Sequence, residues 1–366
     1  MIYVAFYLWI FIQALILEIK LSLELRLIFF SFLTICLVIF AGLRGNIEPD
    51  YSNYQAIFFS SNQGNSFGVE YGYYLINKFF LFLGLGFQSV VFVMAAFTIV
   101  PKLVFFEKYS PNYAFSFLIF FSSVFILFDF IAIRQALAIT LFMVSIPYLI
   151  KRQFLIYFSI ILLATTIHLT AALLLPLYFF THREYNRYLL YIVVLVCSAI
   201  NILKIVVPFL DFIINSFPIP EIAAVKIFAY SNEDAFAFVT VKQCILGFLF
   251  IFIRNNNNLK DSKEVNLFVN LFVFGIFIAT LFNGIPQFSY RIKWYFFWTE
   301  SILVVYLIKE ICFKNIWVTY ILYILFSILY AISFFTLLGE ISGREDYYIY
   351  PYKLFFDLNE KSAYLF

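Results

Sequence analysis

The sequence predicts an all-α integral membrane protein, a polytopic bundle of about 12 transmembrane helices. Three observations lead to this fold class. The chain has 366 residues, of which 64% are hydrophobic and 12% charged, whereas a soluble domain is about 45–50% apolar and about 25% charged. Apolar runs approach the length of about 20 residues that a helix needs to cross a bilayer. Short basic turns separate many of these runs, and longer polar loops separate the others.

The predicted elements follow from these runs in chain order. Twelve runs are interpreted as spans: 2–17, 27–43, 87–106, 113–128, 136–150, 154–165, 169–180, 188–207, 238–253, 265–282, 294–308 and 316–338. The sixth and seventh are short and meet around Thr166 and His168, which predicts a hairpin. Residues 71–83 are tyrosine-rich and too short to span, so we expect a helix lying at the membrane interface.

The distribution of basic residues predicts the orientation of these spans. Lysine and arginine are dense in six short turns, 18–26, 107–112, 151–153, 181–187, 254–264 and 309–315. The positive-inside rule places such turns in the cytoplasm. Both termini, the loops 44–86, 208–237 and 283–293, and the tail 339–366 are then external. Residues 1–366 are expected to form a single integral-membrane domain whose first run is a helix rather than a cleaved signal peptide.

Composition and missing motifs narrow the function classes. The four cysteines, Cys36, Cys197, Cys244 and Cys312, lie far apart in apolar runs without CxxC spacing, and the chain has two histidines. A zinc site is therefore not expected. No Lys/Arg run suggests nucleic acid as a partner. No P-loop, GxSxG or HExxH motif occurs. An enzyme with this sequence is expected to bind no ATP or nucleotide cofactor and to use a membrane-delivered, already activated substrate.

Three arginines stand on the predicted external side, opposite to the bias of the other basic residues. Arg44, Arg134 and Arg291 each lie at or beside a predicted helix end. A single arginine in such a place can be a snorkelling anchor. Three at one face suggest a cationic pocket, and the guanidinium fork matches phosphate oxygens.

Acidic residues and one histidine accompany these arginines. Glu70 opens the interfacial helix, where a carboxylate can also cap the positive helix end. Asp129 precedes Arg134 and can pair with a nearby base. His168 lies in the apolar hairpin, where it is either a hydrogen-bonded core residue or a general base with a pKa near neutrality. Between His168 and Glu70 as the base, His168 is ranked slightly ahead.

Five polar or mixed segments follow one another along the chain: LRGNIEPDYSNY at 43–54, VEYGYYLINKFF at 69–80, FIAIRQALAITLF at 130–142, LLATTIHLTAALLLPLY at 162–178 and YRIKWYF at 290–296. Taken in this order, they resemble the Wzy/EpsG-like polysaccharide polymerases of bacterial membranes. The first departs from the family pattern, because NIEP widens the gap between Arg44 and Asp50.

The resemblance implies a GT-C-like fold and a metal-independent glycosyltransferase. Such a polymerase moves a growing glycan from undecaprenyl pyrophosphate onto the non-reducing end of a new lipid-linked unit, at the outer face of the inner membrane. The implied catalytic residues are His168 and Glu70. The implied substrate-binding residues are Arg44, Asp50, Tyr51, Tyr54, Tyr71, Arg134, Gln135, Arg291 and Tyr295. Expected partners are the lipid-linked oligosaccharide and membrane lipid. A chain-length regulator is also considered, although the sequence contains no sign of one.

Other functions remain open at this stage. A flippase or exporter of lipid-linked glycan also suits many spans, but transporters carry internal repeats and midplane polar residues. Here the charges cluster at one face and no repeat is visible. A membrane acyltransferase would place its histidine early and on the cytoplasmic side. A ligase-type transferase shares the polymerase chemistry.

Overall fold

The computed structural model describes residues 2–19, 21–66, 68–181, 183–203, 205–206, 241–256, 259, 262–283, 285–312, 315–342, 349 and 351–357. Within these ranges the chain is helical, and pairing between extended segments is limited to one isolated β-bridge. The residues form two compact units, Met1–Leu175 with Ile311–Phe366, and Pro176–Glu310. Whether they behave as a single domain stays a prediction.

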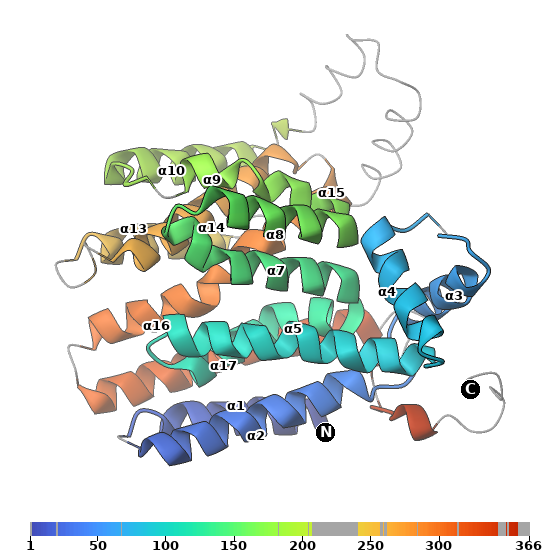
Figure 1. Cartoon of the computed structure of the whole chain (residues 1–366). Coiled ribbons are helices and arrows are strands. Elements are labelled where there is room, and N and C mark those ends of the chain that lie inside the picture. Colours follow the sequence, from blue (N-terminus) through green and yellow to red (C-terminus); the bar gives the residue numbers. More distant parts are fainter. Residues whose placement is uncertain are drawn as a thin grey trace, which may run out of the picture. The chain divides into compact units, whose positions relative to one another are not determined.

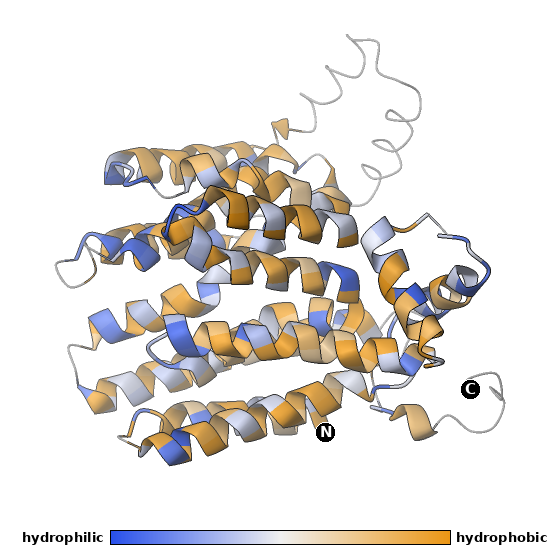
Figure 2. Cartoon of the chain, in the orientation of Figure 1, coloured by the Kyte–Doolittle hydropathy of each residue, from blue (hydrophilic) through white to orange (hydrophobic). Residues whose placement is uncertain are grey.

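The helices confirm an all-α membrane protein. In the described part of the chain, six are long and apolar enough to cross a membrane: Leu23–Gly42, Phe87–Tyr109, Tyr113–Ile131, Ile133–Ile150, Lys263–Leu281 and Ile316–Ser342. Shorter apolar helices cover Ile2–Ile16, Phe154–Ile167, Leu169–Phe180 and Arg187–Ile202. Hydrophobic residues dominate the helix bodies, and hydrophilic residues gather toward helix ends (Figure 2). The total of about 12 spans and the GT-C-like fold stay predictions.

The first unit packs its helices around α5. Its elements are α1 (Ile2–Ile16), α2 (Leu23–Gly42), α3 (Tyr51–Asn62), α4 (Tyr71–Phe82), α5 (Phe87–Tyr109), α6 (Tyr113–Phe120), the π-helix η1 (Phe121–Ile131), α7 (Ile133–Ile150), α8 (Phe154–Ile167), the 3₁₀ helix η2 (Leu169–Leu174), α17 (Ile316–Ser342) and the 3₁₀ turn η3 (Phe355–Asp357). Helix α5 contacts α2, α4, α6, α7 and η1, while α8 packs on α7 and α17 packs on η1.

The second unit has α14 at its centre. Its elements are α9 (Leu177–Phe180), α10 (Arg187–Ile202), α13 (Val241–Arg254), α14 (Lys263–Leu281), α15 (Pro286–Phe297) and α16 (Thr299–Ile311), of which the last residue belongs to the first unit. Helix α14 contacts α10, α13 and α15. Gly275 permits the close approach of α15, since a Cβ there would lie 2.6 Å from Cβ of Phe296.

The polar segment after α2 is more ordered than the sequence suggested. Residues 44–70 were expected as a loop, but Tyr51–Asn62 form α3. Its buried side chains, including Tyr51, Tyr54 and Phe58, recur with helical spacing, although the segment as a whole is polar. Helix α4 confirms the short helix expected at 71–83, and its place at the membrane interface stays a prediction. It packs with α3 as a short hairpin beside the ends of the longer helices (Figure 1).

Two chain breaks were located correctly, and two neighbouring segments were not. The polar stretch near 129–135 breaks at Ala132, between η1 and α7, and the hairpin breaks at His168. The expected loop 283–293 is mostly helical, because Pro286 starts α15 at its first turn. The expected span 294–308 is broken at Trp298. The expected loop 208–237 lies outside the described residues, as do 343–348 and 358–366 of the tail.

The contact between α14 and α15 leads to a test of the second unit. Gly275→Ala places a methyl group against Phe296 and Phe297 and is expected to destabilise the protein by about 1–3 kcal/mol through overpacking. Thermal unfolding of the purified protein in detergent measures the change. Gly339→Ala is the control, because a Cβ at Gly339 meets nothing within 4 Å. Equal melting temperatures for the two variants would contradict the packing described.

Candidate active site

Three segments of the first unit meet at the carboxylate of Glu70. Glu70 immediately precedes α4, Arg134 is the second residue of α7, and His168 lies in the extended break after α8. Oε2 of Glu70 lies 2.5 Å from Nη1 of Arg134, and Oε1 lies 3.4 Å from Nδ1 of His168. We call these three residues the Glu70 cluster.

The Glu70 carboxylate is held by donors from other elements rather than by α4. It makes no capping hydrogen bond to α4, and Oε1 accepts the backbone N–H of Leu169 at 3.1 Å. Partial burial tends to raise the pKa of Glu70, but the contacts with His168, the Leu169 N–H and the charge of Arg134 outweigh that effect and lower it to about 2. Glu70 is therefore ionised at neutral pH and is a weak base.

Two tyrosines bracket the guanidinium of Arg134. Its Cζ lies 5.7 Å from the ring centroids of Tyr54 on α3 and of Tyr73 on α4, and these two rings meet edge to face at 5.8 Å. Such contacts stabilise a cation by about 0.5–2 kcal/mol each. Nε of Arg134 is buried without a hydrogen-bond partner among the described residues. Glu70 and the two rings therefore orient the guanidinium.

Gly72 explains why α4 can come this close to the break after α8. A Cβ at Gly72 would lie 2.4 Å from Oγ1 and 2.7 Å from the carbonyl oxygen of Thr166. A side chain there would push α4 away from the end of α8. The Glu-x-Gly-Tyr segment thus combines three tasks: Glu70 binds Arg134, Gly72 allows the contact, and Tyr73 stacks on Arg134.

His168 brings an imidazole into this cluster at 7% exposure. Its Nδ1 faces Glu70 at a distance long for a hydrogen bond. Both ring nitrogens are buried, and neither has a hydrogen-bond partner in the described part of the protein. A core histidine would have both ring nitrogens satisfied. Because Nδ1 is turned toward Glu70, Nε2 is the nitrogen left to accept a proton from a substrate.

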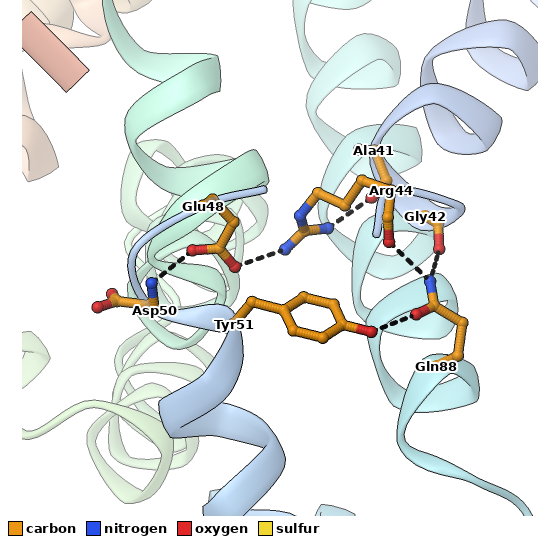
Figure 3. Close-up of polar contacts among 7 residues, drawn as sticks. All are labelled: Ala41, Gly42, Arg44, Glu48, Asp50, Tyr51 and Gln88. Carbon is orange, nitrogen blue, oxygen red and sulfur yellow. Dashed lines mark hydrogen bonds and ion pairs between the residues drawn. The ribbon is translucent and has the colours of Figure 1, made fainter. Parts of the chain in front are cut away.

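Arg44 belongs to a second polar cluster, shown in Figure 3. Its side chain is 1% exposed. Nη1 donates to the carbonyl oxygen of Ala41 at 2.5 Å, and Nη2 lies 3.6 Å from Oε1 of Glu48. Complete burial raises the pKa of Glu48, although Arg44 and the Asp50 N–H lower it in part. Arg44 and the Asp50 N–H thus offset only part of the cost of burying the Glu48 carboxylate.

Gln88 connects this loop to α5. Its Nε2 donates to the carbonyl oxygens of Gly42 at 2.7 Å and Arg44 at 3.2 Å, and its Oε1 accepts from the Tyr51 hydroxyl at 2.8 Å (Figure 3). The end of α2, the loop and the start of α3 are therefore joined through one side chain. Because Tyr51 and Tyr54 lie one turn apart on α3, that helix links Arg44 to the Glu70 cluster.

A C-terminal segment around Leu354 packs against the same loop. Arg44 and Leu354 form an antiparallel β-bridge, and Phe130 lies under the guanidinium at 5.0 Å. Two backbone hydrogen bonds flank the bridge, Gly45 N–H to Lys353 O at 2.9 Å and Phe355 N–H to Leu43 O at 3.0 Å. Binding of substrate by Arg44 stays a prediction; in this structure the side chain supports the loop.

The other predicted site residues are more dispersed. The Asp50 carboxylate points away from Arg44 (Figure 3). Tyr71 is 67% exposed next to Glu70, whereas Gln135 is buried on α7. Arg291 is exposed on α15 of the second unit, and Tyr295 is buried there. The roles of all five in binding substrate stay predictions.

Sequence reasoning missed several partners that the structure supplies. Glu48 is four residues after Arg44, a spacing that signals an ion pair, yet its position in a loop hid the signal. Gln88 lies in an apolar run with no distinguishing neighbour. Tyr73 lies in the tyrosine-rich segment 71–83, where nothing marked it as a partner of Arg134. Asp129 pairs with Lys102 rather than with Arg134.

These observations define an all-α integral membrane protein with a carboxylate, an arginine and a histidine meeting at helix ends. A family model described as the EpsG family matches residues 27–354, which is most of the chain. The chain therefore belongs to the EpsG family. No curated protein and no solved structure matches it.

Within the described ranges, no three side chains of His, Cys, Asp or Glu come together in a way that could hold an ion. A reaction independent of metal stays a prediction.

The lowered pKa of Glu70 predicts an acid-dependent loss of stability. The folded protein binds the Glu70 proton more weakly than the unfolded chain does, so the contribution is fully present above pH about 4.5 and is lost as the pH falls toward about 2. Glu70→Gln lacks it. The difference in melting temperature between wild type and variant should narrow from pH 6 to pH 3. The exposed Glu340→Gln serves as control, and an unchanged Glu70→Gln difference would refute the assignment.

The buried Arg44–Glu48 contact predicts a pattern of stability changes. Arg44→Met leaves Glu48 buried without its cation and is expected to cost about 3–5 kcal/mol, whereas Arg44→Met with Glu48→Leu should recover most of that loss. Arg26→Met is the matched control, because Arg26 and Glu107 are 43% and 45% exposed and such pairs contribute about 0–1 kcal/mol. Unfolding in mixed detergent measures all three. A double variant no more stable than Arg44→Met would exclude charge compensation.

Proposed function

We propose that this protein is a polysaccharide polymerase. It transfers a growing glycan from undecaprenyl pyrophosphate onto the non-reducing end of a new lipid-linked repeat unit, at the outer face of the bacterial inner membrane. The observation that carries this proposal is the Glu70 cluster, in which an oriented arginine and an available imidazole nitrogen meet in a chain of the EpsG family.

Arg134 suits the leaving side of this reaction. When the glycosidic bond to the carrier breaks, negative charge develops on the pyrophosphate, and a fixed guanidinium stabilises it. Glu70 and two tyrosine rings hold the Arg134 side chain in place. Arg134 also stands in the first turn of α7, where the helix end is itself positive and favours an anion.

His168 suits the accepting side. The acceptor hydroxyl oxygen attacks the anomeric carbon, its proton passes to Nε2 of His168, and the bond to the pyrophosphate oxygen breaks with its electron pair. A general base is most effective when its pKa lies near the operating pH, and an unperturbed imidazole has such a pKa. Glu70, with its pKa near 2, instead positions the imidazole through Nδ1 and supports the positive charge it gains.

The remaining predicted residues fit secondary roles. Tyr71, exposed beside Glu70, is proposed to stack on a sugar ring. Tyr54 lies against Arg134 and is proposed to keep it aligned. The proposal also includes contacts with the substrate by the other predicted binding residues, which are Arg44, Asp50, Tyr51, Gln135, Arg291 and Tyr295. A metal-independent reaction and an association with a chain-length regulator are also part of it.

Single substitutions in the Glu70 cluster test the function. Purified protein is incubated with a lipid-pyrophosphate oligosaccharide, and longer glycans and released undecaprenyl pyrophosphate are measured. Arg134→Gln and His168→Gln are each expected to lower turnover by about 100-fold or more. Arg26→Gln, in an exposed ion pair, is the control.

An experiment in cells distinguishes a polymerase from the alternative, a flippase or exporter. Loss of a polymerase leaves single repeat units on the lipid at the outer face, whereas loss of a flippase traps them inside. Wild-type chain length from Arg134→Gln, or units trapped on the inner side, would overturn the proposal.

A further inference from the structure

A further ion pair lies inside the membrane-spanning part of the first unit. Nζ of Lys102 on α5 lies 2.5 Å from Oδ1 of Asp129 on η1, and the two residues are 0% and 1% exposed. The lysine also lies 5.4 Å from the ring centroid of Phe120. Oδ2 of Asp129 is buried without a hydrogen-bond partner in the described part of the chain. The mechanism proposed above uses neither residue.

Stability alone does not account for such a pair. Charged side chains in transmembrane segments are costly and usually functional. The cost of removing two charges from water often exceeds their attraction, so an apolar pair of similar volume is commonly as stable or more stable. What a buried pair does provide is a single allowed arrangement, because any shift leaves a charge without its counterion.

The arrangement that this ion pair restricts is the register of η1 relative to α5. This segment runs for eleven residues as a π-helix, although π-helices are mostly single turns and are often found at functional sites. It ends at Ala132, where the backbone leaves the helical conformation and α7 begins. Asp129 therefore stands three residues before this break and five residues before Arg134.

Both clusters described above depend on that register. Phe130, next to Asp129, lies under the Arg44 guanidinium, and Arg134 reaches Glu70 from the start of α7. A slip of one residue along a helix turns a side chain by about 100° and moves it by about 1.5 Å. Such a slip would separate Arg134 from the Glu70 carboxylate.

We propose that Lys102 and Asp129 are positioning residues that lock the register of η1 and so place Arg134 against Glu70. The effect on catalysis rests on the proposed function. The effect on geometry does not, because the distance between positions 70 and 134 can be measured without an assay of activity.

The test compares a charged pair with an apolar pair. Lys102→Met and Asp129→Leu are combined in one variant, which is expected to insert and fold because no charge is left alone. Asp129→Asn is the second variant; it keeps the shape of the side chain but leaves Lys102 without its counterion, so it is expected to be less stable than the apolar pair. Arg26→Met with Glu107→Leu is the control, since it removes an exposed ion pair of the same chemistry.

Register is read by chemical cross-linking. The natural cysteines are first replaced by alanine, namely Cys36, Cys197, Cys244 and Cys312. Glu70→Cys is then paired with Arg134→Cys, or with Ile133→Cys or Gln135→Cys, and treated with a short thiol-specific linker. In the otherwise natural background and in the control, the pair 70–134 should react best. In the apolar-pair and Asp129→Asn backgrounds, its yield should fall several-fold relative to the pairs 70–133 and 70–135.

Turnover is measured on the same backgrounds with the natural residues at 70 and 134. The apolar pair is expected to lower kcat by about tenfold or more with little change in KM, because Arg134 acts on the transition state. An unchanged cross-linking pattern would overturn the register lock. A changed pattern in a protein that shows no polymerase activity even as wild type would uphold the lock and overturn the proposed function instead.

Discussion

The ion pair between Glu70 and Arg134 is the contact on which the site of the first unit depends. Glu70 starts α4 and Arg134 starts α7, and the same carboxylate accepts the N–H of Leu169 after α8. One side chain thus joins the ends of three helices. The pairing has a physical reason: an arginine in the first turn of a helix opposes the helix dipole, and at a membrane edge it needs a counterion.

Three charge pairs that are buried or partly buried recur through the first unit. Arg44–Glu48 lies within one loop, Glu70–Arg134 joins the starts of α4 and α7, and Lys102–Asp129 joins α5 to η1. Isolated charges away from water are strongly unfavourable, so each pair restricts which surfaces can meet. The many aromatic residues have a related role, because rings of Phe130, Tyr54 and Tyr73 lie against the two arginines. Positioned charge surrounded by aromatic rings suits the transfer from a pyrophosphate-linked sugar that is proposed above.

Hydropathy predicted the membrane class, the short helix α4 and the breaks near Ala132 and His168. It did not predict α3, whose buried face is spread over a polar segment. Nor did it predict the π-helix η1, because the hydropathy of the apolar run at 113–128 is compatible with an α-helix and with a π-helix. The site was predicted in part: Glu70, Arg134 and His168 do come together, whereas Arg44 is buried with Glu48.

By itself, the sequence determined what each segment is: apolar enough for a membrane, polar enough for a helix end, and ordered as in the EpsG family. Only the tertiary structure decided which charge pairs with which. Arg134 lies closer in sequence to Asp129 than to Glu70, yet Lys102 binds Asp129 and leaves Arg134 to Glu70. The reason is physical: hydropathy is a property of one segment, whereas an ion pair depends on which helix ends the packing brings together.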